Sequence, residues 1–103
     1  MRLSFSPRAE DDLEEIGDYI ALDNPARALS FVRELRTQAA RLASAPHACP
    51  MREDLAPNLR MLVFRSYLVF YRVLDHEIRI ERILHGSRDL PGFFTSESDL
   101  SDS

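Results

Sequence analysis

Apolar and polar residues alternate at the start of the chain and then change to a helical spacing. Leu3 and Phe5 alternate with polar neighbours, which predicts a short, half-buried strand over residues 2–6. A helix follows, because Ser6 can cap it, Pro7 suits its first position, and residues 23–25 read Asp-Asn-Pro at its end. The apolar stripe of this helix consists of Ala9, Leu13, Ile16 and Ile20.

The same cap signal is repeated at Asn24 and Pro25, which predicts a second helix directly after the first. Its stripe is formed by Ala28, Val32, Leu35, Ala39 and Leu42, and it is widened by Leu29 and Phe31. Because the junction is short, the two helices are expected to form an antiparallel hairpin whose stripes cover an apolar surface.

Three runs rich in branched and aromatic residues supply that surface after a proline-punctuated loop. They span residues 59–64, 67–74 and 78–85, and their short connections predict antiparallel strands. The middle run is apolar on both faces, so we expect it to be central. The predicted fold class is α+β: a strand, a helical hairpin, then a three-stranded antiparallel sheet packed on the helices.

A chain of 103 residues with 45% hydrophobic content fits one packed domain. We assign that domain to residues 1–94 and expect the acidic tail, residues 95–103, to be disordered. Neither a signal peptide nor a long apolar run is evident, and Cys49 is the single cysteine. These features predict a cytoplasmic protein that makes no membrane contact.

Motifs for metals, cofactors and serine hydrolysis are missing from the sequence. His47 and Cys49 lie two residues apart, but no second pair completes a zinc site, so no metal is predicted. Three scattered glycines build no phosphate-binding loop, and no cofactor is expected. The acidic pairs at 11–12 and 14–15 fit the positive end of a helix dipole, and we interpret them as solvated.

Arginine is the only strongly basic residue, since all thirteen basic residues are arginine and none is lysine. Residues 1–24 carry two arginines and seven acids, whereas residues 25–94 carry eleven arginines and seven acids. Arginines on strands can bind an acidic surface or phosphates, although such charges are as often only solvated. Arg82 is unusual because it shares the strand phase of Ile78, Ile80 and Leu84, which requires a sheet margin or a partner.

The element order, together with three stretches of sequence, resembles the ParE branch of the ParE/RelE toxin superfamily over residues 2–94. The stretches read SPRAEDDLEEIGDYIALDNPARA, then LR followed by YLVFYRV, then IERILHGSRDL. Of these stretches, HGSRDL after the last strand is the most specific for the family, and the others support the resemblance only in combination.

The resemblance implies a toxin of a type II toxin–antitoxin system, neutralised by a ParD-like antitoxin that alone contacts operator DNA. ParE-like toxins are associated with DNA gyrase, whereas RelE-like relatives cut messenger RNA on the ribosome. The fold does not separate these targets, so an RNA-cleaving toxin is the alternative.

Site residues follow from the same resemblance. Arg88 matches the family arginine after the last strand, but Phe93 and Phe94 fall where ribonuclease relatives carry histidine or tyrosine, and a phenyl ring cannot transfer a proton. No catalytic residue is therefore predicted, although His85 could act as a base. We expect target binding at Arg82, His85, Arg88 and Asp89. Antitoxin binding is expected at an apolar groove that includes Leu29, Phe31, Phe93 and Phe94.

Overall fold

Six regular elements follow one another in the predicted order. A computed structural model gives the structure, which describes residues 1–94, so the prediction for residues 95–103 lies outside the described residues. The elements are β1 (Arg2–Phe5), α1 (Pro7–Ala21), α2 (Pro25–Arg41), β2 (Arg60–Phe64), β3 (Tyr67–Val73) and β4 (Glu77–His85). A further helical turn covers residues 90–94.

The strands form one mixed sheet in the order β1-β4-β3-β2. β2, β3 and β4 are antiparallel neighbours, and β1 adds a fourth strand parallel to β4, with Leu3 opposite Ile78. The α+β class is confirmed, and β3 is central as predicted. The sequence predicted three paired strands, and β1 adds a fourth to the sheet. The short alternating pattern of β1 does not specify which strand it pairs with.

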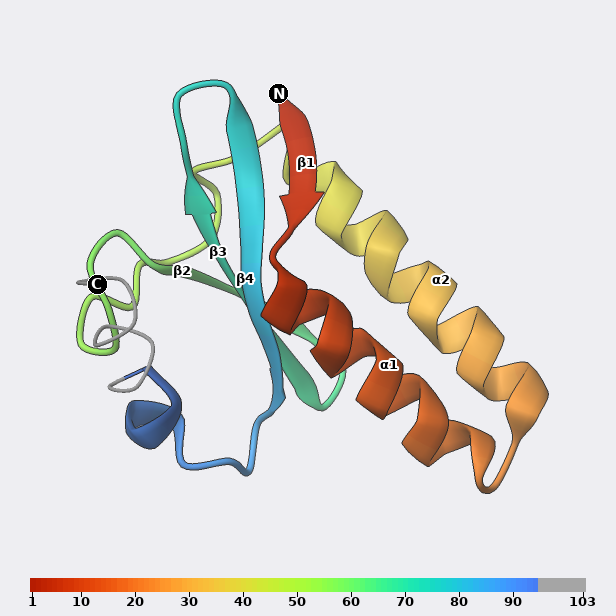
Figure 1. The fold of residues 1–103 in the computed structure, drawn as a ribbon. Helices are drawn as coiled ribbons and strands as arrows, with labels where there is room; N and C mark the ends of the chain where they lie inside the picture. Colours follow the sequence, from red (N-terminus) through yellow and green to blue (C-terminus); the bar gives the residue numbers. More distant parts are fainter. Residues whose placement is uncertain (95–103) are drawn as a thin grey trace.

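Both helices begin at the predicted caps. The Ser6 hydroxyl accepts a hydrogen bond from the Ala9 N–H at 3.0 Å, and the Asn24 side chain accepts one from the Arg27 N–H at 3.0 Å. Each cap satisfies a backbone donor that has no partner within the helix. The helices lie side by side against one face of the sheet (Figure 1).

The larger apolar core lies between the helices and that face of the sheet. Phe31 is part of it, 5% exposed, and its ring contacts the rings of Phe64 and Tyr67 edge to face. The helical contribution consists of Ala9, Leu13, Ile16, Phe31, Leu35, Ala39 and Leu42, and the strands contribute Phe64, Val69, Tyr71, Ile78, Ile80 and Ile83.

A smaller core covers the opposite face of the sheet. There Phe94, 1% exposed, packs against Phe70 with ring centroids 4.7 Å apart, beside Leu84. Ala56 and Leu59 from the loop before β2 complete this core. Residues 90–94 therefore lie across the sheet from the helical hairpin (Figure 1).

A β-bulge in β4 changes which way its side chains face. Tyr71 pairs with Ile80 and Phe70 pairs with Arg82, so Glu81 is an extra residue on β4. Ile80 and Ile83 both belong to the helix-side core, while Leu84 belongs to the smaller one. The expectation that Arg82 shares a face with Ile78 and Ile80 is therefore wrong, because the bulge shifts the alternation by one residue.

Candidate functional site

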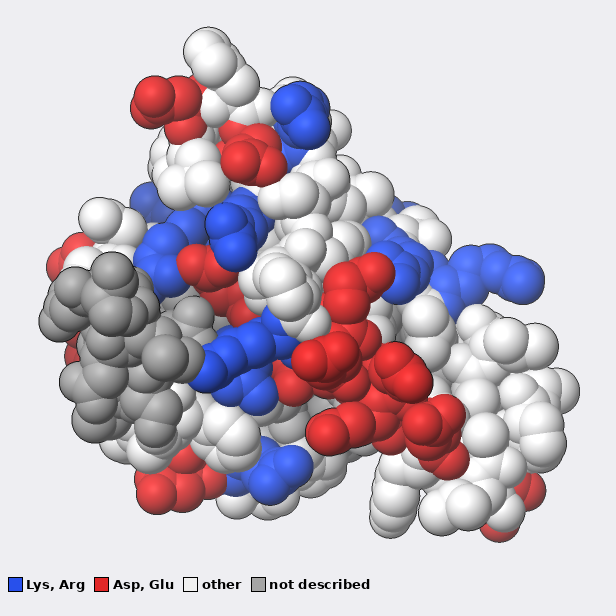
Figure 2. All heavy atoms as spheres, in the orientation of Figure 1, with Lys and Arg blue, Asp and Glu red and all other residues white. Residues whose placement is uncertain are grey.

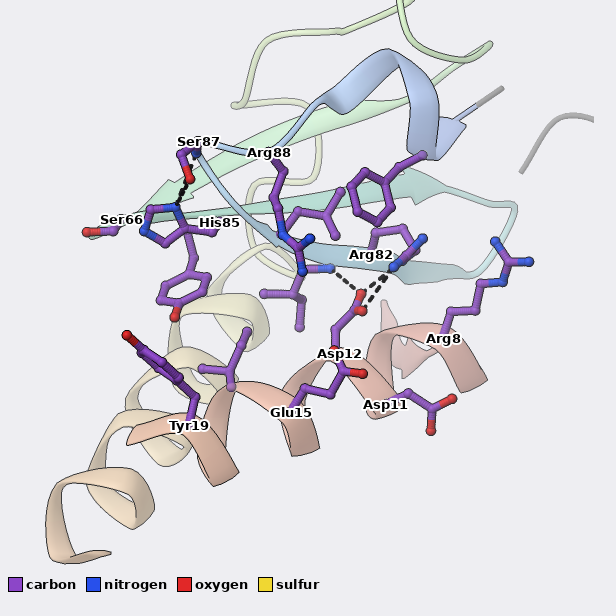
Figure 3. A pocket seen from close by; sticks show the side chains of 15 residues that line it. Arg8, Asp11, Asp12, Glu15, Tyr19, Ser66, Arg82, His85, Ser87 and Arg88 are labelled. Carbon is purple, nitrogen blue, oxygen red and sulfur yellow. Dashed lines mark hydrogen bonds and ion pairs between the residues drawn. The ribbon is translucent and has the colours of Figure 1, made fainter. Parts of the chain in front are cut away.

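A cleft of about 900 Å³ opens between α1 and the C-terminal end of β4 (Figure 3). We call it the α1–β4 cleft. The α1 side is lined by Arg8, Asp11, Asp12, Glu15, Ile16 and Tyr19. The opposite side is lined by Ser66, Tyr67, Arg82, Ile83, Leu84, His85, Ser87, Arg88 and Phe93.

The cleft forms where β1 stops pairing with β4. Beyond Phe5, the N-cap residue of α1 bonds the edge of β4: the Ser6 N–H donates to the Ile80 carbonyl at 2.8 Å, and the Ser6 hydroxyl donates to the Glu81 carbonyl at 2.8 Å. Six residues after Ser6, Asp12 accepts a hydrogen bond from the Ile83 N–H at 2.9 Å. These bonds fix α1 against β4 and define the base of the cleft.

Asp12 also binds Arg82 through both carboxylate oxygens. Arg82 Nε lies 2.9 Å from Oδ2 and its terminal nitrogen lies 3.0 Å from Oδ1, with side-chain exposures of 11% and 9% for Arg82 and Asp12. The interpretation of Asp12 as a solvated acid is wrong, whereas Asp11 is exposed. Consecutive helical residues point about 100° apart, so one carboxylate faces the sheet and its neighbour faces solvent.

Arg82 and Arg88 flank the ring of Phe93. Their guanidinium carbons lie 5.1 and 5.3 Å from its centroid, within cation–π range. Arg88 is exposed and extends from the turn after β4 into the cleft (Figure 3). Within residues 1–94, its guanidinium has no carboxylate in ion-pair range, so its charge is available to a ligand.

His85 lies at the end of the cleft on an exposed stretch of backbone. Its Nδ1 lies 2.8 Å from the Ser87 hydroxyl and accepts from the Ser87 N–H at 3.2 Å, which leaves Nε2 as the protonated nitrogen of the neutral ring. The ring packs edge to face on Tyr67 at 5.3 Å. Burial, together with the nearby Tyr19, raises the pKa of the Tyr67 phenol above its ordinary value.

Three of the four residues predicted for target binding meet in this cleft: Arg82, His85 and Arg88. Asp89 lies instead at an adjoining hollow of about 340 Å³, where a Cβ added to Gly92 would come within 3.1 Å of its carboxylate. The residues of α1 that form the other side were missed. The recurrence of Asp11, Glu15 and Tyr19 at intervals of four was the signal that could have found them.

The four residues predicted for antitoxin binding are not brought together. Phe31 and Phe94 are buried in different cores, so neither presents an apolar surface, and Phe93 lines the α1–β4 cleft. Leu29 is 70% exposed beside an open groove of about 1030 Å³ between α1 and α2. Of the four, only Leu29 borders that groove.

In the part of the chain that the structure describes, no three His, Cys, Asp or Glu side chains are grouped so that they could hold a metal ion. Across residues 1–94, neither helix has the length and apolar character needed to cross a bilayer.

Known proteins share this sequence pattern and this architecture. A family model described as ParE toxin of type II toxin-antitoxin system, parDE, matches residues 3–90. A chain in the solved structure "Chromosomal ParDE TA system from P. aeruginosa" superposes with a TM-score of 0.72 and 30% sequence identity, covering 82% of this chain and 95% of that one. No curated protein matches the sequence.

Proposed function

This chain belongs to the ParE toxin family of type II toxin–antitoxin systems, and from that premise we propose that it inhibits DNA gyrase and is neutralised by a ParD-like antitoxin. We further propose that the α1–β4 cleft is the surface that contacts gyrase. The alternative within the superfamily is a toxin that cuts messenger RNA on the ribosome.

The chemistry of the cleft is the observation that carries this proposal. Cutting RNA requires a group that activates the 2′-hydroxyl, charge that stabilises the phosphorane, and an acid that protonates the leaving oxygen. Arg82 is held by Asp12, and the chain contains no lysine. Phe93 packs on arginines and Phe94 is buried, and a phenyl ring has no group that can transfer a proton. The cleft is thus better suited to binding than to acid–base catalysis.

His85 is the residue that favours the alternative, because an imidazole can act as acid or base near neutral pH. Its Nδ1 is engaged by Ser87, which leaves Nε2 to face a ligand. A second proton-transfer group is then needed. Burial raises the pKa of the Tyr67 phenol further from neutral pH, which makes this phenol a poor base and a weaker acid than an ordinary tyrosine.

Incubation with translating ribosomes separates the two targets. We expect the purified protein to leave ribosome-bound messenger RNA intact, as judged by primer extension, because the cleft lacks a matched acid and base. A His85→Ala variant serves as the control. Cleavage by the wild type that disappears in this variant would establish the ribonuclease alternative.

The groove between α1 and α2 supports the antitoxin proposal. Small residues, among them Gly17, Ala21 and Ala28, line this groove and leave room for side chains of a partner, and the exposed Leu29 borders it. An amphipathic segment can bury apolar side chains in such a groove. We propose that the antitoxin tail occupies it and covers Leu29.

Leu29→Glu is expected to leave toxicity intact and to weaken antitoxin binding at least tenfold, because a carboxylate replaces an apolar contact. Co-expression with the antitoxin encoded beside the toxin, followed by co-purification and a growth assay, measures both effects. Leu22→Glu is the matched control, since Leu22 is 86% exposed and does not line the groove. Equal neutralisation of both variants would remove Leu29 from the interface.

A further inference from the structure

Unpaired charges of opposite sign face each other across the α1–β4 cleft. Asp11 and Glu15 are exposed on α1, and within the described residues neither has a cation in ion-pair range. Two other acids of α1 do form ion pairs: Glu10 pairs with Arg36 at 3.0 Å, and Asp12 pairs with Arg82. Of the three acids that line the cleft, only Asp12 is therefore paired, and Asp11 and Glu15 face Arg88 with no ion pair among the described residues.

Figure 2 shows the resulting pattern, with acidic side chains gathered over α1 directly beside basic side chains over the lower part of β4. Asp11 and Glu15 are one helical turn apart, so their side chains lie roughly 5–6 Å from each other at Cβ. Tyr19 follows one turn later and is 72% exposed. The α1 side of the cleft thus begins at Arg8, continues with the exposed acids Asp11 and Glu15 and ends at an aromatic residue, whereas the opposite side is basic.

This arrangement opposes binding of a nucleic-acid strand. Such a strand carries a negative charge at every phosphate, and proteins that track one do so with a continuous basic groove. In this cleft, a strand that places one phosphate near Arg88 would bring the adjacent phosphates close to the carboxylates of Asp11 and Glu15. A polypeptide has no such constraint, because its side chains can present either sign at successive positions.

We infer that the α1–β4 cleft takes a polypeptide segment of its target, which presents a basic side chain to Asp11 and Glu15 and a carboxylate to Arg88. The inference rests on the proposed function in assuming that the toxin meets its target through this cleft. From Arg8 to Tyr19 the α1 side spans about 16 Å at a rise of 1.5 Å per residue. About five residues of extended chain match that length.

The sign of one mutational effect tests this inference. Neutralising the acids in Asp11→Asn/Glu15→Gln removes an attraction if the ligand is a polypeptide with a basic group. It removes a repulsion if the ligand is a polyanion. We expect the double variant to require at least tenfold more protein to inhibit gyrase supercoiling, and to arrest growth at least tenfold less on induction without antitoxin.

Asp23→Asn/Asp75→Asn is the matched control, because it changes the net charge equally at exposed residues outside the cleft. It is expected to act like the wild type, and thermal melts of both double variants check the fold. A parallel measurement records fluorescence anisotropy of labelled single-stranded 20-mer DNA and RNA at low salt. We expect no binding by the wild type.

Several outcomes would overturn the inference. The first is that the Asp11→Asn/Glu15→Gln variant inhibits gyrase and arrests growth as well as, or better than, the wild type. The second is that the wild type binds the oligonucleotides and that Arg88→Ala loses this binding. If the wild type arrests growth but leaves gyrase active, the proposed target fails, and the growth comparison alone then decides whether the acidic side of the cleft is required.

Discussion

Asp12→Ala is expected to lower the free energy of unfolding by about 3–5 kcal/mol, because it removes one partner of a buried ion pair. Arg82 then loses the carboxylate that two of its nitrogens bind, and the Ile83 N–H loses its acceptor. Urea unfolding monitored by circular dichroism measures the loss.

Asp11→Ala is the matched control for this substitution. It changes the adjacent residue of the same helix in the same way, but Asp11 is exposed, so we expect a change within about 0.5 kcal/mol. The double variant Asp12→Leu/Arg82→Met should recover much of the lost stability, because apolar residues of similar size can replace a buried pair. A loss below about 1 kcal/mol for Asp12→Ala would show that the pair does not hold α1 to β4.

Phe94→Ala is expected to destabilise the protein by about 3–5 kcal/mol, the usual cost of emptying the space of a buried aromatic ring. Phe94 is 1% exposed and packs on Phe70 in the smaller core. Because it lies in the last described turn, its removal should also detach residues 90–94 from the sheet. Thermal melts and amide hydrogen exchange at Phe70 measure the two effects.

Phe93→Ala provides the comparison for Phe94→Ala, since the neighbouring ring is only partly buried. We expect it to cost less than half as much, while reorienting Arg88, whose guanidinium packs on that ring. Equal and small losses in both variants would mean that the smaller core does not depend on residues 90–94.

The helical hairpin could be predicted because its signals are local. Ser6 and Asn24 cap their helices as expected, since a cap and the amide it accepts from lie three residues apart. The apolar spacing also located the core-facing side of each helix. β1 was predicted as a strand, but its parallel pairing with β4 joins segments about 75 residues apart and leaves no local signal.

The site was predicted only where its residues are close in sequence. Arg82, His85 and Arg88 follow one another around the end of β4, so a single segment revealed them. Asp12 was misread because its partner is 70 residues away and because the bulge at Glu81 turns Arg82 from the face that strict alternation assigns. The only mark that this bulge leaves in the sequence is Arg82 itself, a charged residue in an apolar phase, which a sheet margin or a partner would explain equally well.

The central claim is that this toxin acts on gyrase, and a plasmid assay with purified gyrase tests it most directly. Relaxed plasmid, ATP and gyrase are incubated with increasing toxin, and supercoiled, relaxed and cleaved DNA are separated on a gel. We expect supercoiling to fall and cleaved DNA to accumulate with the wild type, and Arg88→Ala to need at least tenfold more protein. Full supercoiling with no cleaved DNA at toxin in large excess over gyrase would contradict the account.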